Sequence, residues 1–204
     1  MTLMLKRIVI VAVLACVAAG CGTTTPAISR PVTEPLIDQP GEDLVRYRDA
    51  VIEVVLETGF ANQNLGEPWL IVNVALSGMT GAASQVKRDR VSVRTPDGRT
   101  IPLPSYKEFL AAWDSELAAA ARRAGIASQP LDFTRANRRS CVLGFMPEPG
   151  SGQSTRTALN VTNREVCVGM LYFPIAGGVQ PGDWRLVLEF EETDAVVPFT
   201  LGEG

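Results

Sequence analysis

Two cysteines carry the clearest chemistry in this sequence. Cys141 and Cys167 each lie in an apolar run that alternates like a strand, CVLGF (141–145) and VCVGMLYF (166–173). In each run the cysteine shares a face with a leucine and a phenylalanine, so both sulfurs are expected on core-facing sides of strands. In an oxidising compartment such a pair forms a structural disulfide, worth about 3–4 kcal/mol in the chain-entropy model. A redox-active thiol needs exposure and a positive neighbour, and the apolar surroundings favour the structural bridge instead.

Residues for acid–base catalysis are scarce. The sequence contains no histidine, which removes the usual general base near neutral pH and the commonest metal ligand. Glu53, Glu57, Asp114 and Glu116 fall at spacings typical of solvated faces, and EETD (191–194) is typical of a solvated turn. We therefore expect no catalytic residue, no metal and no cofactor. A carboxylate pair assembled by the fold, as in glycan-cleaving enzymes, remains the alternative.

Arginines concentrate in one part of the chain. If they meet on one face, they form a positive patch for lipid headgroups or anionic wall polymers, because guanidinium groups match phosphate and carboxylate. The alternative is scattered surface charge that only keeps the protein soluble. The candidate residues are Arg122, Arg123, Arg135, Arg138 and Arg139.

The first twenty residues have the pattern of a secretory signal. Lys6 and Arg7 are followed by an uncharged apolar run from Ile8 to Ala19. A helix needs about 20 apolar residues to cross a bilayer, so this run is too short to span one and has the length of a signal-peptide h-region. Removing residues 1–20 takes away two basic residues and no acidic one, so the formal net charge goes from −3 to −5. An acidic chain of this kind is not expected to bind nucleic acid.

The residues at the end of this predicted signal form a second pattern. Ala18-Ala19-Gly20-Cys21 resembles the lipobox of bacterial lipoproteins, with Ala18 where that motif usually has leucine. The resemblance implies cleavage before Cys21, a diacylglycerol on its sulfur and an acylated new amine. Gly22 in place of aspartate resembles lipoproteins sent to the outer membrane, facing the periplasm, if the cell has two membranes; otherwise the cell surface is implied.

Ordinary secretion with Cys21 left as a thiol is the alternative to the anchor. Cysteine parity argues against it, because Cys16 leaves with the signal, Cys141 and Cys167 pair, and an unpaired thiol would remain outside the cell. We therefore predict a lipoprotein signal peptide over 1–20 and a lipid-anchored tether rich in threonine and proline over 21–47. The composition of the tether does not support a packed core.

The rest of the chain, 48–204, reads as a single domain made mostly of strands. Each predicted strand shows apolar alternation or a short apolar run, and Pro96-Asp97-Gly98 marks a hairpin within 91–104. Besides that hairpin, the predicted strands are VIEVVLE (51–57), WLIVNVAL (69–76), CVLGF (141–145), VCVGMLYF (166–173), WRLVLEF (184–190) and AVVPFTL (195–201).

One helix interrupts this pattern, over about 105–124. Ser105 and Glu108 form a capping box, an apolar stripe follows at helical spacing, and Gly125 is a stop signal. We expect the stripe to pack on a sheet rather than on a membrane surface, because acidic residues share its polar face. The predicted fold is an antiparallel immunoglobulin-like β-sandwich with this one inserted helix.

These features predict a non-catalytic envelope lipoprotein. It would bind or scaffold a protein or a cell-wall or envelope polymer outside the cytoplasm, held at the membrane by its N-terminal lipid. Two alternatives stay open: an extracytoplasmic enzyme that uses carboxylates on glycans, and an accessory subunit of a membrane complex.

Overall fold

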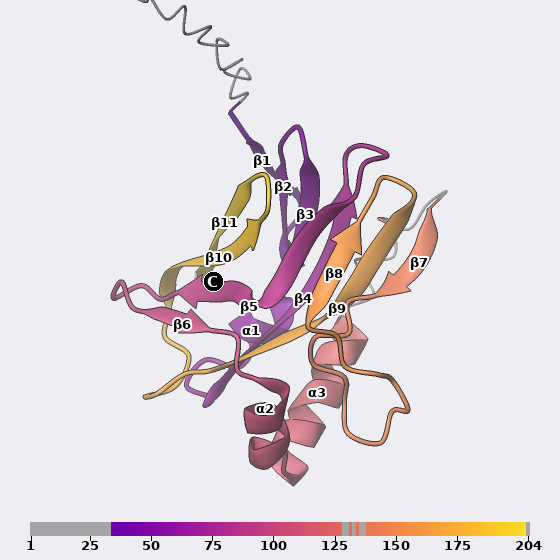
Figure 1. The fold of residues 1–204 in the computed structure, drawn as a ribbon. Helices are drawn as coiled ribbons and strands as arrows, with labels where there is room; N and C mark the ends of the chain where they lie inside the picture. Colours follow the sequence, from indigo (N-terminus) through magenta and orange to yellow (C-terminus); the bar gives the residue numbers. More distant parts are fainter. Residues whose placement is uncertain (1–33, 128–130, 132–133, 135–137, 203–204) are drawn as a thin grey trace, which may run out of the picture. The chain divides into compact units, whose positions relative to one another are not determined.

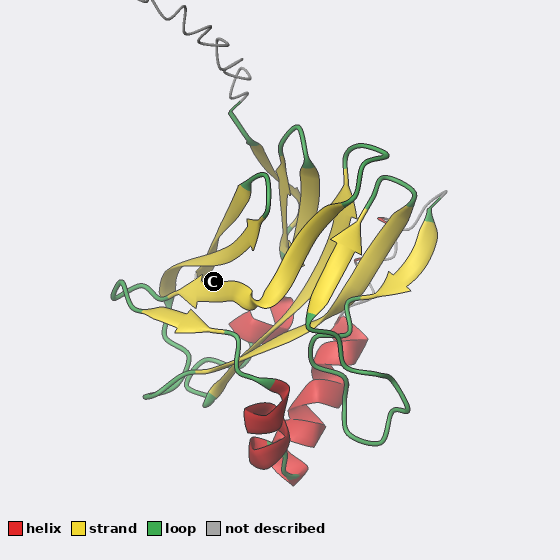
Figure 2. Ribbon diagram, viewed as in Figure 1, coloured by secondary structure: helices red, strands yellow, loops and turns green. Residues whose placement is uncertain are grey.

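The computed structural model describes residues 34–127, 131, 134 and 138–202. These residues form eleven strands in two sheets and three helices (Figures 1 and 2). The strands are β1 (Leu36–Gly41), β2 (Leu44–Arg48), β3 (Ile52–Glu57), β4 (Trp69–Gly78), β5 (Ser84–Arg94), β6 (Thr100–Pro102), β7 (Arg139–Val142), β8 (Ala158–Val161), β9 (Glu165–Pro174), β10 (Gly182–Phe190) and β11 (Asp194–Leu201). The helices are α1 (Gly59–Asn62), α2 (Tyr106–Ala112) and α3 (Ser115–Ala127).

The first sheet has the order β1-β2-β3-β4-β9-β7, and the second has the order β11-β10-β5-β6 with β8 also paired to β5. Neighbouring strands are antiparallel except β7 and β9, which run parallel. The mostly β fold is therefore confirmed, while the prediction of a purely antiparallel protein is wrong at this edge. Parallel neighbours need a crossover connection, and here the chain passes from β7 through β8 of the second sheet before it enters β9.

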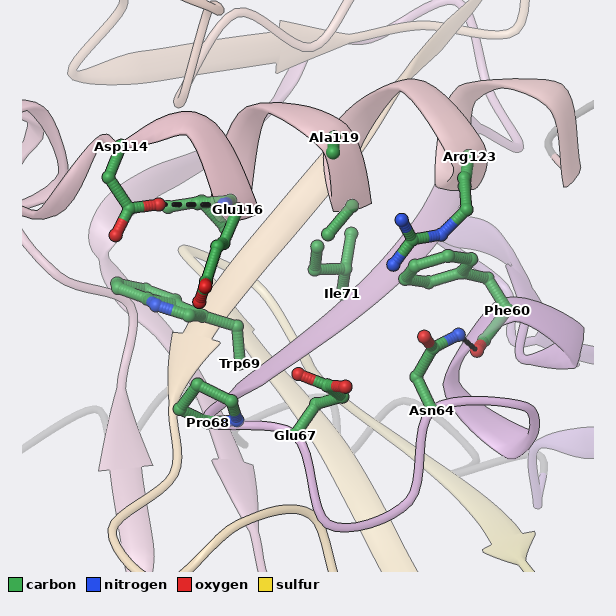
Figure 3. A pocket seen from close by; sticks show the side chains of 12 residues that line it. Phe60, Asn64, Glu67, Pro68, Trp69, Ile71, Asp114, Glu116, Ala119 and Arg123 are labelled. Carbon is green, nitrogen blue, oxygen red and sulfur yellow. Dashed lines mark hydrogen bonds between the residues drawn. The ribbon is translucent and has the colours of Figure 1, made fainter.

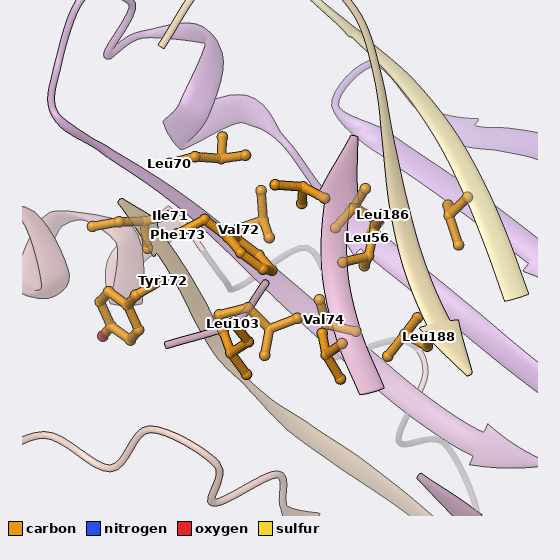
Figure 4. Close-up of a cluster of buried hydrophobic side chains, with 14 of the residues drawn as sticks. Leu56, Leu70, Ile71, Val72, Val74, Leu103, Tyr172, Phe173, Leu186 and Leu188 are labelled. Atoms are coloured by element: carbon orange, nitrogen blue, oxygen red, sulfur yellow. The ribbon is translucent and has the colours of Figure 1, made fainter. Parts of the chain in front are cut away.

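The main core lies between the two sheets. Leu56, Val72 and Val74 from the first sheet meet Leu186 and Leu188 from the second, and none of them is exposed (Figure 4). Alternation along each strand places these side chains on one face, and each contributes about 1.5–3 kcal/mol by leaving water.

The outer face of the first sheet is covered as well. All six residues of β3 are buried, because α3 and Leu131 pack on the side that faces away from the second sheet. On β9, Tyr172 contacts Phe109 of α2 with ring centroids 4.9 Å apart. The apolar helical stripe therefore packs on a sheet, as predicted.

The single predicted helix is in fact two. The capping box at the start of α2 is confirmed: Glu108 N donates to Ser105 Oγ at 3.2 Å, and Ser105 N donates to Glu108 Oε2 at 2.8 Å. The chain then breaks after Ala112 and α3 begins at Ser115, where the N–H of Leu117 donates to Asp114 Oδ1 at 2.8 Å. This second cap explains the break. Gly125 does not end the helix, since α3 continues to Ala127.

The folded domain begins earlier than residue 48. β1 and β2 form a hairpin inside the segment assigned to the tether, with Leu44, Val45 and Tyr47 buried. β1 is largely exposed and is joined to β2 by an ion pair between Asp38 and Arg46. A polar edge strand of this kind has the composition of a linker. The sequence pattern therefore did not predict β1. The predicted signal peptide, and the predicted tether up to residue 33, lie outside the described residues.

No helix within the described ranges combines the length and apolarity that crossing a membrane requires.

Candidate functional site

A groove of about 360 Å³ lies between α3 and the segment that joins α1 to β4 (Figure 3). Its floor is apolar, because Phe60, Ile71 and Leu117 are buried there. Trp69 is partly exposed at the start of β4 and also lines the groove. A concave apolar floor bordered by polar groups that can orient a ligand is typical of a binding site. We refer to this feature as the α3 groove.

Local sequence explains why space is left here. The face of α3 that borders the groove carries small residues, Ala119 and Ala120, so the helix approaches β4 without filling the groove. The start of α3 is fixed by its Asp114 cap, and Trp69 is held by pairing with Pro174 of β9. Both walls are therefore set by backbone structure.

Charged side chains surround the floor. Glu67, Asp114 and Glu116 line the α3 groove together with Arg123, whose guanidinium carbon lies 5.9 Å from the centroid of the Phe60 ring. Among the described residues, none hydrogen bonds to or forms an ion pair with the carboxylate of Glu67 or Glu116. The indole N–H of Trp69 likewise has no acceptor within the described part of the chain. These polar groups are therefore free to contact a ligand.

A buried hydrogen-bond link holds the two walls together. Glu57 Oε1 accepts from the N–H of Gly59 at 2.7 Å, and Glu57 Oε2 accepts from Asn73 Nδ2 at 2.7 Å. The same Asn73 nitrogen donates to the carbonyl of Ala124 in α3 at 2.9 Å. Burial raises the pKa of Glu57, and the hydrogen bonds from Asn73 and from the start of α1 oppose the rise. We call these residues the Glu57–Asn73 link.

Gly59 is required at this link. A Cβ there would lie 2.7 Å from Asp43 Oδ2 and 2.9 Å from Glu57 Oε1, closer than nonbonded atoms approach. The absence of a side chain lets two carboxylates approach the start of α1, the element that carries Phe60 into the groove.

A second buried carboxylate forms an ion cluster on the same strand. Glu53 accepts from Arg48 Nη2 at 2.7 Å and from Arg138 Nη1 at 3.2 Å, and Arg138 also donates to Ser77 Oγ at 2.7 Å. Burial alone would raise the pKa of Glu53, but the two guanidinium groups lower it below the usual glutamate range. This cluster joins the start of β7 to β3 and β4.

Protonating Glu53 should therefore destabilise the fold in acid. Because its folded-state pKa is lowered, its stabilising contribution is complete above the pKa of glutamate in the unfolded chain and is lost as pH falls through the folded-state pKa. Glu53→Gln should flatten the acid side of a stability–pH profile measured by urea unfolding. Glu42→Gln, at an exposed turn position, is the matched control and should leave the profile unchanged. An equally steep acid limb in both variants would contradict the assignment.

The structure separates the arginines of the candidate patch into different environments. Arg138 is partly exposed and forms an ion pair with Glu53, so part of its charge is already compensated within the protein. Arg123 lies in the α3 groove, while Arg122 on α3 and Arg139 on β7 are exposed. Arg135 lies outside the described residues.

The structure joins Cys141 to Cys167 by a disulfide, in agreement with the sequence prediction. The two residues are direct partners in the parallel β7–β9 pair, with Cα atoms 4.2 Å apart. Cys167 is fully buried, whereas Cys141 is partly exposed on the last strand of the sheet. Cys21 lies outside the described residues.

A second groove, of about 610 Å³, lies between β1 and the β10–β11 hairpin. Several of its polar groups already have partners: Asp38 pairs with Arg46, Asp183 accepts from Thr200, and Trp184 Nε1 donates to a backbone carbonyl at 3.0 Å. The α3 groove differs because no described residue hydrogen bonds to the carboxylates of Glu67 and Glu116 or to the indole N–H of Trp69.

Sequence patterns pointed to only part of this site. Asp114 and Glu116 were recognised as carboxylates, but Phe60, Glu67 and Trp69 were not, because their proximity to α3 depends on tertiary packing. A carboxylate from EETD also proved to be structural, since Glu192 Oε2 accepts from Ser84 Oγ at 2.5 Å. In the described part of the chain, no group of three or more cysteine, aspartate or glutamate side chains is arranged to hold a metal ion.

No family model, curated protein or solved structure matches this chain.

Proposed function

We propose that this protein is a non-catalytic envelope lipoprotein that binds a protein or an envelope polymer through the α3 groove. The observation that carries the proposal is the groove itself, with a partly exposed tryptophan and with the carboxylates of Glu67 and Glu116 free of partners among the described residues. The proposal includes an immunoglobulin-like β-sandwich as the scaffold, supported by two sheets that share one core.

The N-terminal sequence supports the location. Lys6, Arg7, the apolar run and Cys21 together have the features of a lipoprotein signal. Acyl chains contribute about 0.8 kcal/mol per buried methylene, so more than one chain on the same cysteine anchors a protein stably. The folded domain begins at Leu36, which leaves residues 22–35 to connect it to the lipid.

A glycan-cleaving enzyme is the alternative that the groove itself raises. Glu67 and Glu116 enter the α3 groove from opposite walls (Figure 3), as two catalytic carboxylates would. A general acid at neutral pH needs burial or a close partner that keeps its proton. Both carboxylates are exposed, and no described residue hydrogen bonds to them, so we favour binding over catalysis.

The anchor is tested by replacing its sulfur. Cys21→Ser should release the protein from the membrane fraction of its native cells, because no thioether to a lipid can form. Cys16→Ser is the matched control, since Cys16 lies before the predicted cleavage site; this variant should stay with the membranes. Retention of the Cys21→Ser protein with the membranes would overturn the anchor.

The binding role is tested by photo-crosslinking in the native envelope. A photoreactive residue at Ala119, in the wall of the α3 groove, should capture one specific protein or polymer, and Trp69→Leu should abolish that capture. The same residue placed at Glu42, on an exposed turn, is the control and should capture nothing specific. Capture of a membrane-complex subunit would identify the protein as an accessory subunit. In a separate assay, release of soluble sugars from wall glycans by the purified protein would favour the enzyme.

A further inference from the structure

We propose that the α3 groove recognises an organic cation, an ammonium or guanidinium group that sits against Trp69 between the carboxylates of Glu67 and Glu116. The inference rests on the proposed function, because it names the ligand class of the same groove. It is carried by three features of that groove: its charge balance, its aromatic surface and its size.

The charge balance favours a cation. Among the described residues, the carboxylates of Glu67, Asp114 and Glu116 line the α3 groove, together with one guanidinium, that of Arg123. Arg123 is placed over the Phe60 ring, and it forms no ion pair with a described carboxylate. The groove therefore has an excess of negative charge that its own cation leaves uncompensated. Approach of a positive group is favoured there, and approach of an anion is opposed.

The aromatic surface adds a second attraction. Figure 3 shows the side chain of Glu116 directed toward the indole of Trp69 in the groove. The face of an indole ring carries negative potential, so it does not attract a carboxylate. A cation placed between the indole face and the carboxylate is attracted to both groups. Tryptophan gives the strongest such interaction among the aromatic side chains.

Hydrogen bonding points the same way. An ionised carboxylate only accepts hydrogen bonds, so Glu67 and Glu116 call for a ligand that donates. An ammonium group offers three N–H donors and a guanidinium group five. Charge-assisted bonds of this kind are about twice as strong as neutral ones, which favours a cation over the hydroxyl groups of a neutral sugar.

The size of the α3 groove sets the scale of the ligand. A volume of about 360 Å³ is at the lower end of the range for small-molecule sites. It accommodates one basic side chain of a partner protein, or a free polyamine. The recognised chemistry is the same in both cases, so the source is distinguished by the probes used.

The test is calorimetric titration of the full-length protein in detergent. The probes are spermidine, a peptide containing two lysines, and a neutral tetramer of N-acetylglucosamine. We expect the cationic probes to bind and the neutral glycan not to bind. Binding of both cationic probes would indicate a free amine as the natural source, and binding of the peptide alone would indicate a basic side chain of a partner.

Matched variants separate the contributions. Trp69→Leu keeps an apolar side chain but removes the indole, and Glu116→Gln removes one charge; each should weaken cation binding about tenfold. Glu42→Gln removes a charge of the same kind from an exposed turn outside the groove and should leave affinity unchanged. Raising the salt concentration should also weaken binding, because the carboxylates are exposed.

Two results would overturn the proposal. The first is absence of binding by both cationic probes; the second is binding of the neutral glycan with Glu116→Gln unaffected. In either case, photo-crosslinking from Ala119 that is lost in Trp69→Leu would still support the α3 groove as the binding site. Loss of that capture as well would reject the proposed function together with its ligand class.

Discussion

Reduction of the Cys141–Cys167 disulfide is expected to lower the free energy of unfolding by about 3.5 kcal/mol. The two cysteines are 26 residues apart, and the bond restricts the unfolded chain by closing a loop of that length. Small domains are stable by about 5–15 kcal/mol, so this loss is a large fraction of the total. Urea unfolding with and without a reductant measures it directly.

The effect should also be local. β7 has four residues and is the last strand of its sheet, paired with β9 through the segment that contains both cysteines. Once the bond is reduced, amide hydrogens in β7 should exchange much faster, whereas those in β3 and β4 should stay protected until global unfolding. Equal unfolding midpoints for the oxidised and reduced proteins would contradict the prediction, as would two freely alkylatable thiols in the folded protein before reduction.

A matched control separates the bond from the side chains. Val142→Ala changes the neighbouring residue on the same strand, whose side chain is 45% exposed, and should alter the free energy of unfolding by less than about 0.5 kcal/mol. The variant in which both cysteines are alanine should lose at least as much stability as reduction causes. The reason is that Cys167 is fully buried, so truncating it adds a packing defect to the loss of the bond.

Strands with strong apolar alternation were predictable from the sequence. β3, β4, β9, β10 and β11 coincide closely with the predicted segments, as does the β5–β6 hairpin. β1 was missed because its side chains are polar or exposed. The amino-terminal half of β5 was missed because residues 87–90 are all charged. They form an irregularity opposite Glu189, between the pairs Leu188–Val91 and Phe190–Val86, and this interrupts the alternation on which a sequence prediction depends.

The candidate site was harder to predict than the fold. Periodicity tells which side of a strand or helix is apolar, and it placed the helical stripe correctly on a sheet. It does not show that Trp69 and the small residues of α3 line one groove, because these segments are about 50 residues apart in the sequence. The same limit applies to Arg138, whose partner Glu53 lies far earlier in the chain. Both were read as surface charges, although tertiary packing buries Glu53.

Asn73→Ala is the second substitution with a large expected effect. Asn73 is 1% exposed and is the donor that joins Glu57 to the carbonyl of Ala124. Its removal leaves a buried carboxylate oxygen and a buried carbonyl without their donor. We expect the free energy of unfolding to fall by about 2–3 kcal/mol, the usual cost of unsatisfied buried groups when one of them is charged. Chemical unfolding at neutral pH measures the change.

The size of this loss should depend on pH. Burial already raises the pKa of Glu57, and the charge of Asp43 adds to the rise; loss of the Asn73 hydrogen bond raises it further. A group with a raised folded-state pKa stabilises fully below its unfolded-state pKa, and that contribution is lost as pH rises through the folded-state pKa. The deficit of Asn73→Ala should therefore be smaller at about pH 4 than at about pH 8. A deficit that is the same at both pH values would show that Glu57 is not the group affected.

A matched asparagine provides the control. Asn160 accepts from Gln85 Nε2 at 2.9 Å on the exposed side of β8, so Asn160→Ala should cost less than about 0.5 kcal/mol at either pH. The two substitutions also differ in their expected effect on the α3 groove. Asn73 connects α3 to the carboxylate that holds α1, and both groove walls depend on that connection. Asn73→Ala should therefore weaken binding of spermidine and speed hydrogen exchange in α3, whereas Asn160→Ala should change neither.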